Sequence, residues 1–247
     1  MGSAARAVVL MAAALALSSC GQSADPLSGR AAPVEGLSVG VSIVENPAFS
    51  IVATATTAEV IARSEPDDAA PMVVNLGHPR PTGSALVFQV IGEEPGWVEV
   101  RLPIRPNGSR GWVRLDDVAL SKNPYRLEID VSAHQLLLWH ANELVLDTVV
   151  AIGTGATPTP IGDFYLTELL QPPDPTGPYG TYAYGLSGYS ETLQSFNGGD
   201  GVIGLHGTND PASLGSDVSH GCVRLANEVI DELATFLPLG TPVAITA

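Results

Sequence analysis

The sequence predicts a mainly β fold made of two β-rich parts, with one short helix close to the C-terminus. Short apolar runs rich in β-branched residues are separated by turn residues through most of residues 39–170, a spacing typical of strands. In residues 227–237, apolar residues instead recur at helical spacing, and Pro238 and Gly240 end that pattern. The chain of 247 residues is long enough for one large or two small domains.

The first residues have the features of a secretion signal. Arg6 precedes an unbroken apolar run over residues 7–17, which is too short to span a bilayer, since spanning needs about 20 residues. The run leads into Leu-Ser-Ser-Cys, which resembles the lipobox of bacterial lipoproteins, with Cys20 as the residue that receives the lipid. Residues 1–19 are therefore interpreted as a lipoprotein signal peptide. The alternative is an ordinary secretory signal in which Cys20 occurs by chance.

The residues after this signal favour an anchored, extracytoplasmic protein. Residues 20–38 are small, polar and contain Pro and Gly, as expected of a flexible tether. Lipid chains on Cys20 would anchor the protein to the cell membrane, where it would face the cell wall. The signal holds one of the 11 basic residues and none of the 26 acidic ones, so the rest of the chain has a net charge of −16. This charge argues against nucleic acid as a partner.

Residues 39–122 are predicted to form a small β domain. The turn sequence Pro-Asn-Gly-Ser between two apolar runs favours a hairpin, because Asn-Gly tolerates positive φ. The segment around Trp97 and Trp112 resembles a bacterial SH3-like domain, in which Gly-Trp pairs precede strands. This resemblance implies peptidoglycan binding or a spacer role, and the two tryptophans are interpreted mainly as core residues. The pattern changes at Asn123, so a second domain is expected over residues 123–247.

The second domain is expected to be β-rich with a C-terminal helix. Apolar runs between residues 125 and 170 indicate strands. Residues 171–200, rich in Gly, Pro and Tyr, are expected to form a long irregular loop of the kind that often covers a functional site. Tyrosines of this loop, Tyr184 among them, either line a substrate groove or pack in the core. Asn227 is the expected N-cap of the final helix.

Cys222 is one of only two cysteines, and four explanations are open for it: a buried thiol, half of a disulfide with Cys20, a metal ligand or a nucleophile. A lipid on Cys20 would leave Cys222 without a disulfide partner, which favours a nucleophile outside the cell. Zinc held by His206, His220 and Cys222 is the main chemical alternative. Because the close His-x-Cys spacing is unusual for zinc, no metal is predicted.

Residues 206–224 contain the groups that a cysteine nucleophile requires. Such chemistry needs a thiolate, a proton acceptor and N–H groups that hold an oxyanion. His206 and His220 each offer an imidazole, and Gly221 would let the backbone beside Cys222 approach a substrate closely. The stretch "HGTNDPASLGSDVSHGCVRL", with fifteen residues between His206 and Cys222, resembles the signature of the YkuD-type L,D-transpeptidase catalytic domain.

The resemblance implies a role for each residue of the motif. It makes Cys222 the nucleophile and His206 its base, while His220 orders the site. The carbonyl of Gly207 would orient the imidazole, and N–H groups around Gly221 and Cys222 would form the oxyanion hole.

The residue two positions after the cysteine has two possible roles, because Arg224 could bind a substrate carboxylate or form a structural salt bridge. The complete predicted set is Cys222, His206, His220 and Gly221 for catalysis, and Ser219, Arg224, Gly207 and Tyr184 for substrate binding.

The resemblance also implies the reaction. The thiolate would attack the third residue of a peptidoglycan tetrapeptide stem, release D-Ala, and pass the acyl group to the side-chain amine of a neighbouring stem. No cofactor is expected, and β-lactams of the carbapenem class should acylate Cys222. Two alternatives remain open: a hydrolase or D-amino-acid exchange enzyme that uses the same acyl-enzyme, and a non-catalytic lipoprotein that binds the cell wall.

Overall fold

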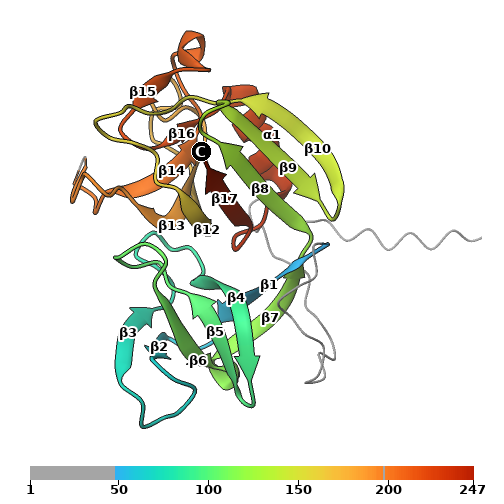
Figure 1. Ribbon diagram of the computed structural model, residues 1–247, viewed down its shortest axis with the longest axis vertical. Coiled ribbons are helices and arrows are strands. Elements are labelled where there is room, and N and C mark those ends of the chain that lie inside the picture. Colours follow the sequence, from blue (N-terminus) through green and yellow to red (C-terminus); the bar gives the residue numbers. More distant parts are fainter. Residues whose placement is uncertain (1–47, 197) are drawn as a thin grey trace, which may run out of the picture.

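A computed structural model describes residues 48–196 and 198–247 of the chain (Figure 1). The predicted signal peptide, the lipidation site at Cys20, the tether of residues 20–38 and residues 39–47 of the predicted SH3-like part lie outside the described residues. Within the described ranges, no helix is long and apolar enough to cross a membrane.

The described chain is built from two β-rich parts, one above the other in Figure 1, which confirms the predicted mainly β class. The first part is a seven-stranded sheet in the order β3-β2-β6-β5-β4-β1-β7. Its elements are β1 (Ser50–Ala55), β2 (Glu59–Arg63), β3 (Met72–Gly77), β4 (Val87–Glu94), β5 (Trp97–Arg101), β6 (Arg110–Arg114), the 3₁₀ turn η2 (Leu115–Asp117) and β7 (Val118–Asn123).

The second part is an eight-stranded sheet in the order β10-β9-β8-β17-β12-β13-β14-β16, with a separate two-stranded pair, β11-β15. Its elements are β8 (Tyr125–Asp130), β9 (Gln135–His140), β10 (Glu143–Val149), β11 (Ile152–Gly153), β12 (Gly162–Leu170), β13 (Ala183–Tyr189), β14 (Val202–His206), the 3₁₀ turn η3 (Pro211–Ser213), β15 (Asp217–Ser219), β16 (Val223–Arg224), α1 (Asn227–Phe236) and β17 (Pro242–Thr246).

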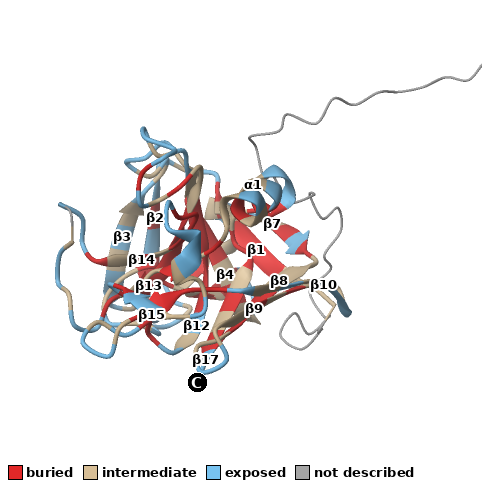
Figure 2. Ribbon diagram, turned by 90° about the horizontal axis from the view of Figure 1, so that it is seen from above, coloured by how far each residue is buried: buried red, intermediate tan, exposed pale blue. Residues whose placement is uncertain are grey.

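Each part has its own apolar core, because alternating strand residues turn to one face of each sheet. In the first part, Phe88 and Val100 are fully buried, and Trp97 is 8% exposed with the guanidinium of Arg114 over its ring. In the second part, α1 contributes its buried residues Ile230 and Leu233 to the core. Figure 2 shows buried residues gathered in the strands and exposed residues mainly in the loops. The resemblance of the first part to SH3-like domains stays a prediction.

The chain passes from one sheet to the other between Asn123 and Tyr125. Asn123 is completely buried, and its side chain is hydrogen-bonded on both sides. Its Nδ2 donates to Thr241 Oγ1 at 2.9 Å, and its Oδ1 accepts the N–H of Tyr125 at 3.0 Å. Both polar atoms of this buried amide are thus satisfied, which fixes the crossing point against the second sheet.

The predicted irregular loop at residues 171–200 is wrong over its centre, where β13 is a strand between β12 and β14. The glycines that suggested a loop are there for packing. A methyl group on Gly188 would lie 2.5 Å from the ring of Phe164, and one on Gly185 would lie 2.8 Å from Oε1 of Glu168. Glycine in a strand is favoured where a neighbouring group approaches this closely.

Asn227 is not the N-cap of the final helix. The cap is Ala226, and Asn227 is the first helical residue. Its side chain instead accepts the N–H of Thr208 at 3.0 Å. The polar residue that suggested a cap therefore ties α1 to the segment that follows β14.

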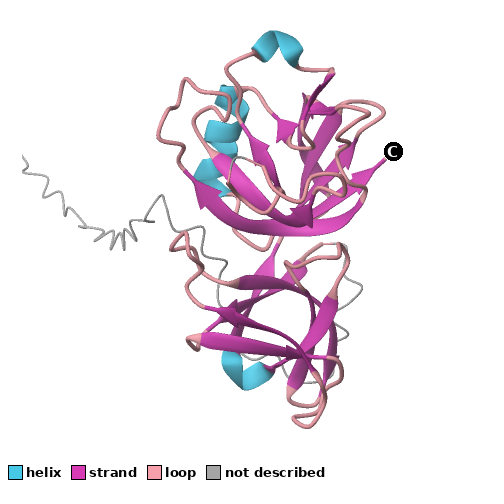
Figure 3. Ribbon diagram, turned by 90° about the vertical axis from the view of Figure 1, so that its left-hand side faces the viewer, coloured by secondary structure: helices cyan, strands magenta, loops and turns pink. Residues whose placement is uncertain are grey.

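The two parts contact each other directly (Figure 3). Tyr165 is completely buried in a small apolar cluster with Val52 and Val87 of the first part, and its hydroxyl donates to the carbonyl of Arg101 at 3.2 Å. Burial raises the pKa of this phenol. Beside it, Arg101 forms an ion pair with Asp163 at 2.8 Å.

Candidate active site around Cys222

The topology of the second sheet brings together the two sequence segments that carry reactive groups. Strands β14 and β16 are parallel neighbours, with Leu205 opposite Val223 and His206 opposite Arg224. His206 is the last residue of β14, and Cys222 directly precedes β16. Two residues with fifteen others between them in the chain therefore meet at one end of the sheet.

His206 is a buried imidazole in a defined tautomer. The residue is 3% exposed, and its Nδ1 lies 2.6 Å from the carbonyl oxygen of Gly207. A carbonyl can only accept, so Nδ1 carries the hydrogen and Nε2 has the free lone pair. Burial lowers the pKa of His206 to about 4, with a smaller contribution in the same direction from the positive charge of Arg224. The imidazole is therefore neutral at physiological pH.

Cys222 is a free thiol beside this imidazole. The N–H of Gly204 donates to its Sγ at 3.3 Å. A methyl group on Gly204 would lie 3.5 Å from Cδ2 of His206 and 3.8 Å from Sγ of Cys222, so both side chains approach the same point above β14. Burial raises the pKa of the thiol, although the Gly204 N–H and the charge of Arg224 oppose this. Thiol and imidazole are therefore both neutral at rest.

A short turn holds Cys222 in place. The hydroxyl of Ser219 donates to the carbonyl of Cys222 at 2.6 Å and accepts the N–H of Gly221 at 3.1 Å. Gly221 has a φ of +112°, and a Cβ there would lie 2.9 Å from Ile203, so this position requires glycine. Thr157 supports the turn from outside, since its hydroxyl donates to the carbonyl of Ser219 at 3.1 Å.

This turn changes the expected oxyanion hole. The N–H of Gly221 is already bonded to Ser219, so it is not free for a substrate oxyanion. The N–H of Cys222 has no acceptor among the described residues and is the donor left open beside the thiol. Of the N–H groups predicted around Gly221 and Cys222, that of Cys222 is therefore the open donor, and Gly221 supports the turn through its conformation. The oxyanion hole itself stays a prediction.

His220 and Arg224 differ in how they are held. His220 is exposed, and its ring stacks on Phe196 with centroids 4.9 Å apart. Arg224 is partly buried and forms no ion pair within residues 48–196 and 198–247, and its buried Nε has no hydrogen-bond partner there. Of the two roles predicted for Arg224, the structural salt bridge is therefore not supported.

Two cavities open beside the thiol, with volumes of about 530 and 190 Å³. The larger is bordered by β13, β14 and the carboxylate residue Glu168, and the smaller by His220 and Arg224. Four residues border both cavities: Tyr179, Phe196, His206 and Cys222. The reactive pair thus lies where the two cavities meet, and either one could hold a substrate segment.

Tyr184 borders the larger cavity, but its phenol is buried. The hydroxyl lies 2.9 Å from the carbonyl oxygen of Leu237 and 3.2 Å from that of Leu233, so its hydrogen is used at the end of α1. This leaves no free hydroxyl for a substrate. Tyr179 is the loop tyrosine that lies beside the reactive pair, with its ring centroid 4.9 Å from that of His206.

Several residues at the site are outside the predicted set. Gly204 could have been found from sequence, because it lies two residues before His206 and alternate strand residues share a face. Phe196 and Glu168 could not have been found from a local motif. The pairing of β12 with β13 brings Glu168 to the larger cavity, and the β13–β14 connection brings Phe196 there. In the part of the chain that the structure describes, no group of three or more His, Cys, Asp or Glu residues could hold a metal ion.

Comparisons with known proteins find similarity in this second part. Residues 124–245 match the family model described as the L,D-transpeptidase catalytic domain. The chain is 37% identical over 123 residues to a protein of Bacillus licheniformis named as an L,D-transpeptidase YkuD, a match that covers 50% of this chain and 66% of that protein. The corresponding protein of Bacillus subtilis strain 168 is 37% identical over 122 residues, covering 49% and 66%. The chain spans just under two thirds of the length of these relatives.

Among solved structures, an L,D-transpeptidase from Mycobacterium smegmatis aligns with a TM-score of 0.41 and 16% identity, over 65% of this chain and 90% of that chain. The similarity to L,D-transpeptidase catalytic domains therefore lies in residues 124–245, the second β-rich part of the chain.

Proposed function

We propose that the chain is a peptidoglycan L,D-transpeptidase that works through a thioacyl-enzyme on Cys222. The observation that carries this proposal is the neutral pair of Cys222 and His206, with the free Nε2 lone pair of the imidazole, at the meeting point of two cavities. A neutral pair can transfer the thiol proton as the sulfur attacks, so a resting thiolate is not required.

In the first step, the sulfur of Cys222 attacks the carbonyl carbon of the third residue of a tetrapeptide stem. The thiol proton moves to Nε2 of His206, and the N–H of Cys222 donates to the developing oxyanion. The C–N bond to the terminal D-Ala then breaks, and His206 returns the proton to the leaving amine. The products are a thioester on Cys222 and free D-Ala.

In the second step, the side-chain amine of a neighbouring stem attacks the thioester carbon. His206 accepts a proton from this amine, the C–S bond breaks, and the proton returns to the sulfur. The product is a cross-link between two third-position residues. The two cavities that meet at Cys222 support a two-substrate reaction, because the acceptor amine can enter the cavity that the leaving D-Ala vacates while the acylated stem stays in the other.

Arg224 favours one orientation of the donor stem in the two cavities. Its partly buried guanidinium borders the smaller cavity and has no carboxylate partner among the described residues. A C-terminal D-Ala carboxylate matches the donor geometry of a guanidinium. We therefore assign the leaving D-Ala to the smaller cavity and the rest of the donor stem to the larger one.

The N-terminal residues are proposed to anchor the protein to the membrane. A lipid on Cys20 would anchor the enzyme outside the cytoplasm, with the tether of residues 20–38 extending the catalytic domain towards the wall. We also propose that the first β domain binds the cell wall.

The test is muropeptide analysis of the full-length protein on a disaccharide-tetrapeptide donor. The wild type should release D-Ala and form cross-linked dimers, Cys222→Ala should do neither, and the matched control Cys20→Ala should retain both. Absence of D-Ala release by the wild type would exclude the enzymatic proposal. D-Ala release without dimers would favour the alternative, a hydrolase or exchange enzyme that uses water or a free D-amino acid.

A second assay follows the thiol directly. A carbapenem should add its whole mass to the wild-type chain, because attack on the lactam carbonyl opens the ring without loss of an atom. Peptide mapping should locate the added mass at Cys222, and Cys222→Ala should stay unmodified.

A further inference from the structure

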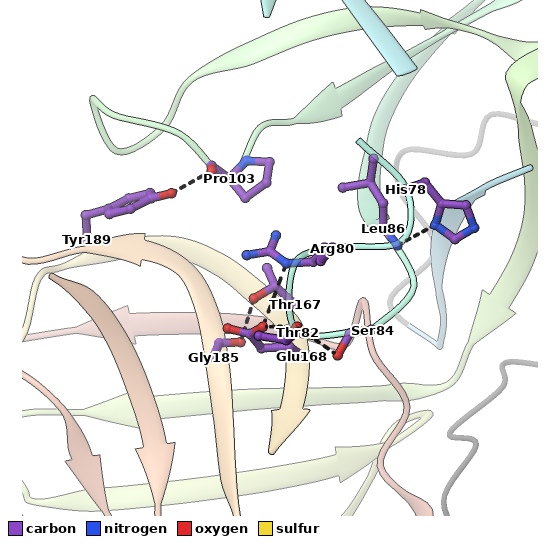
Figure 4. Close-up of polar contacts among 10 residues, drawn as sticks. All are labelled: His78, Arg80, Thr82, Ser84, Leu86, Pro103, Thr167, Glu168, Gly185 and Tyr189. Carbon is purple, nitrogen blue, oxygen red and sulfur yellow. Dashed lines mark hydrogen bonds and ion pairs between the residues drawn. The ribbon is translucent and has the colours of Figure 1, made fainter. Parts of the chain in front are cut away.

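The connection between β5 and β6 of the first β domain contacts the second domain beside the candidate active site. Between β5 and β6, Pro103, Arg105 and Asn107 face the residues that join β13 to β14. The hydroxyl of Tyr189 donates to the carbonyl of Pro103 at 2.7 Å (Figure 4). The side chain of Asn107 exchanges two hydrogen bonds with the backbone of Tyr189, at 2.8 and 2.9 Å. The end of β13 is thus fixed to the other domain.

Arg105 forms the most extensive of these contacts. Its Nη1 donates to the carbonyl of Ser190 at 2.7 Å, and its Nη2 donates to the carbonyls of Leu193 and Asp200 at 2.9 and 2.8 Å. The guanidinium also lies over the ring of Tyr189, 4.8 Å from its centroid. One charged group therefore gathers carbonyls from both ends of the β13–β14 connection, and hydrogen bonds from a charged donor are stronger than neutral ones.

The far end of this connection is part of the active site. Phe196 and Gly199 exchange backbone hydrogen bonds, both at 2.9 Å, which hold these two residues side by side. The ring of Phe196 stacks on His220 and borders both cavities beside Cys222. Asp200, whose carbonyl Arg105 holds, borders the larger cavity as well.

We propose that Arg105 is a positioning residue for the active site, which holds the β13–β14 connection so that Phe196 forms a wall of both cavities at Cys222. This inference rests on the proposed transpeptidase function and extends it, because it makes the first β domain part of the active-site architecture. A spacer or wall-binding role for that domain does not require these contacts.

A second contact between the domains ends at the same larger cavity. Thr82 of the first domain donates to Oε2 of Glu168 at 2.7 Å, and Nε of Arg80 lies 3.8 Å from the same oxygen (Figure 4). Glu168 borders the larger cavity and is 9% exposed. The first domain therefore supports that cavity at two separate places.

Arg101 provides a matched control for Arg105. Both are partly buried arginines of the first domain that bind the second, but Arg101 pairs with Asp163, which borders neither cavity. Arg101→Ala therefore removes a comparable contact between the domains without releasing the connection. A general loss of domain docking should appear in both variants, whereas a loss of cavity shape should appear only in Arg105→Ala.

The test measures D-Ala release from the tetrapeptide donor by full-length Arg105→Ala, Arg101→Ala, Phe196→Ala and the double variant Arg105→Ala/Phe196→Ala. Arg105→Ala should lower kcat/KM about tenfold, mainly through KM, since a displaced wall weakens substrate positioning. Arg101→Ala should stay within about twofold of the wild type, as expected for a contact remote from the site. The double variant should be no worse than the poorer single variant, because both changes remove the same wall.

Equal effects of Arg105→Ala and Arg101→Ala would overturn the proposal, and so would additive losses in the double variant. A measurement that does not need transpeptidase activity separates this outcome from failure of the proposed function. Iodoacetamide should alkylate Cys222 several-fold faster in Arg105→Ala than in the wild type or Arg101→Ala, as followed by peptide mapping, because the cavity wall beside the thiol is displaced. Unchanged alkylation of Cys222 in Arg105→Ala would contradict the positioning role even if the wild type released no D-Ala.

Discussion

The two histidines around Cys222 have opposite surroundings. His220 is separated from the cysteine by one residue in the sequence, yet it is exposed and stacks on Phe196. His206 is separated from the cysteine by fifteen residues, yet it is buried, and its Nδ1 is fixed by the carbonyl of Gly207. Its ring also lies beside the same backbone point as the thiol. Proximity in the sequence therefore does not identify the base, whereas burial, tautomer and strand pairing favour His206.

The largest effect that separates the two histidines is expected from His206→Gln. Loss of the base should lower kcat/KM for D-Ala release by about 10³-fold, within the range typical of general-base removal. His140→Gln is the matched control, because that histidine packs against the ring of Tyr125 at a tilt and borders neither cavity. A loss of less than tenfold in His206→Gln would contradict its assignment as base.

A smaller effect is expected from the turn that carries His220. Ser219→Ala removes two hydrogen bonds that hold the Gly221–Cys222 backbone. The expected loss in kcat/KM is about tenfold, because the thiol and its N–H lose their fixed positions. Ser213→Ala removes a hydroxyl that donates to the carbonyl of Asp210 away from both cavities, and this control should behave like the wild type.

His220→Ala should have a weaker effect still. The substitution removes the ring on which Phe196 stacks, but Arg105 still holds the connection that carries Phe196. The expected loss in kcat/KM is within about threefold, since a single exposed ring contact contributes little. A loss as large as that of His206→Gln would reverse the comparison and make His220 the base.

The smallest expected effect is that of pH on kcat/KM over the neutral range. Because the pKa of His206 is lowered to about 4, the imidazole keeps its free lone pair down to that pH. The acidic limb of kcat/KM should therefore lie near pH 4 and not near 6.5, where an unperturbed histidine titrates. A pH–rate profile on the tetrapeptide donor measures this, and a limb near 6.5 would contradict a buried neutral base.

The same shift predicts how stability depends on pH. Between pH 6.5 and 4, the unfolded chain binds a proton at His206 that the folded chain excludes. The contribution of His206 to stability is therefore complete above pH 6.5 and is lost as the pH falls to about 4. Urea unfolding of wild type and His206→Gln should show a smaller decrease in stability for the variant over this window.

Local sequence signals predicted part of this molecule, and the missing part depends on packing between distant residues. The strand alternation and the helix of residues 227–236 follow from periodicity, and the motif from His206 to Cys222 follows from spacing. β13 was missed because Gly185 and Gly188 resemble loop residues until Glu168 and Phe164 are seen to fill the space beside them. A sequence pattern covers one segment at a time, whereas the need for glycine at these two positions comes from side chains on a neighbouring strand.

The contact of Arg105 with the β13–β14 connection had no sequence signal at all. Arg105 lies in a turn of the first domain, and its partners are backbone carbonyls, which have no residue identity to recognise. The sequence likewise left two roles open for Arg224. The structure shows that its guanidinium forms no ion pair among the described residues.

The most direct test of the central claim is to trap the acyl-enzyme on a rapid timescale. Wild type, His206→Gln and His220→Ala are mixed with the tetrapeptide donor, quenched in acid, and mapped by mass spectrometry for an acyl group on the peptide that contains Cys222. We expect an adduct on Cys222 that forms at a similar rate in wild type and His220→Ala, and about 10³-fold more slowly in His206→Gln. An adduct on another residue, or slow formation in His220→Ala with normal formation in His206→Gln, would contradict it.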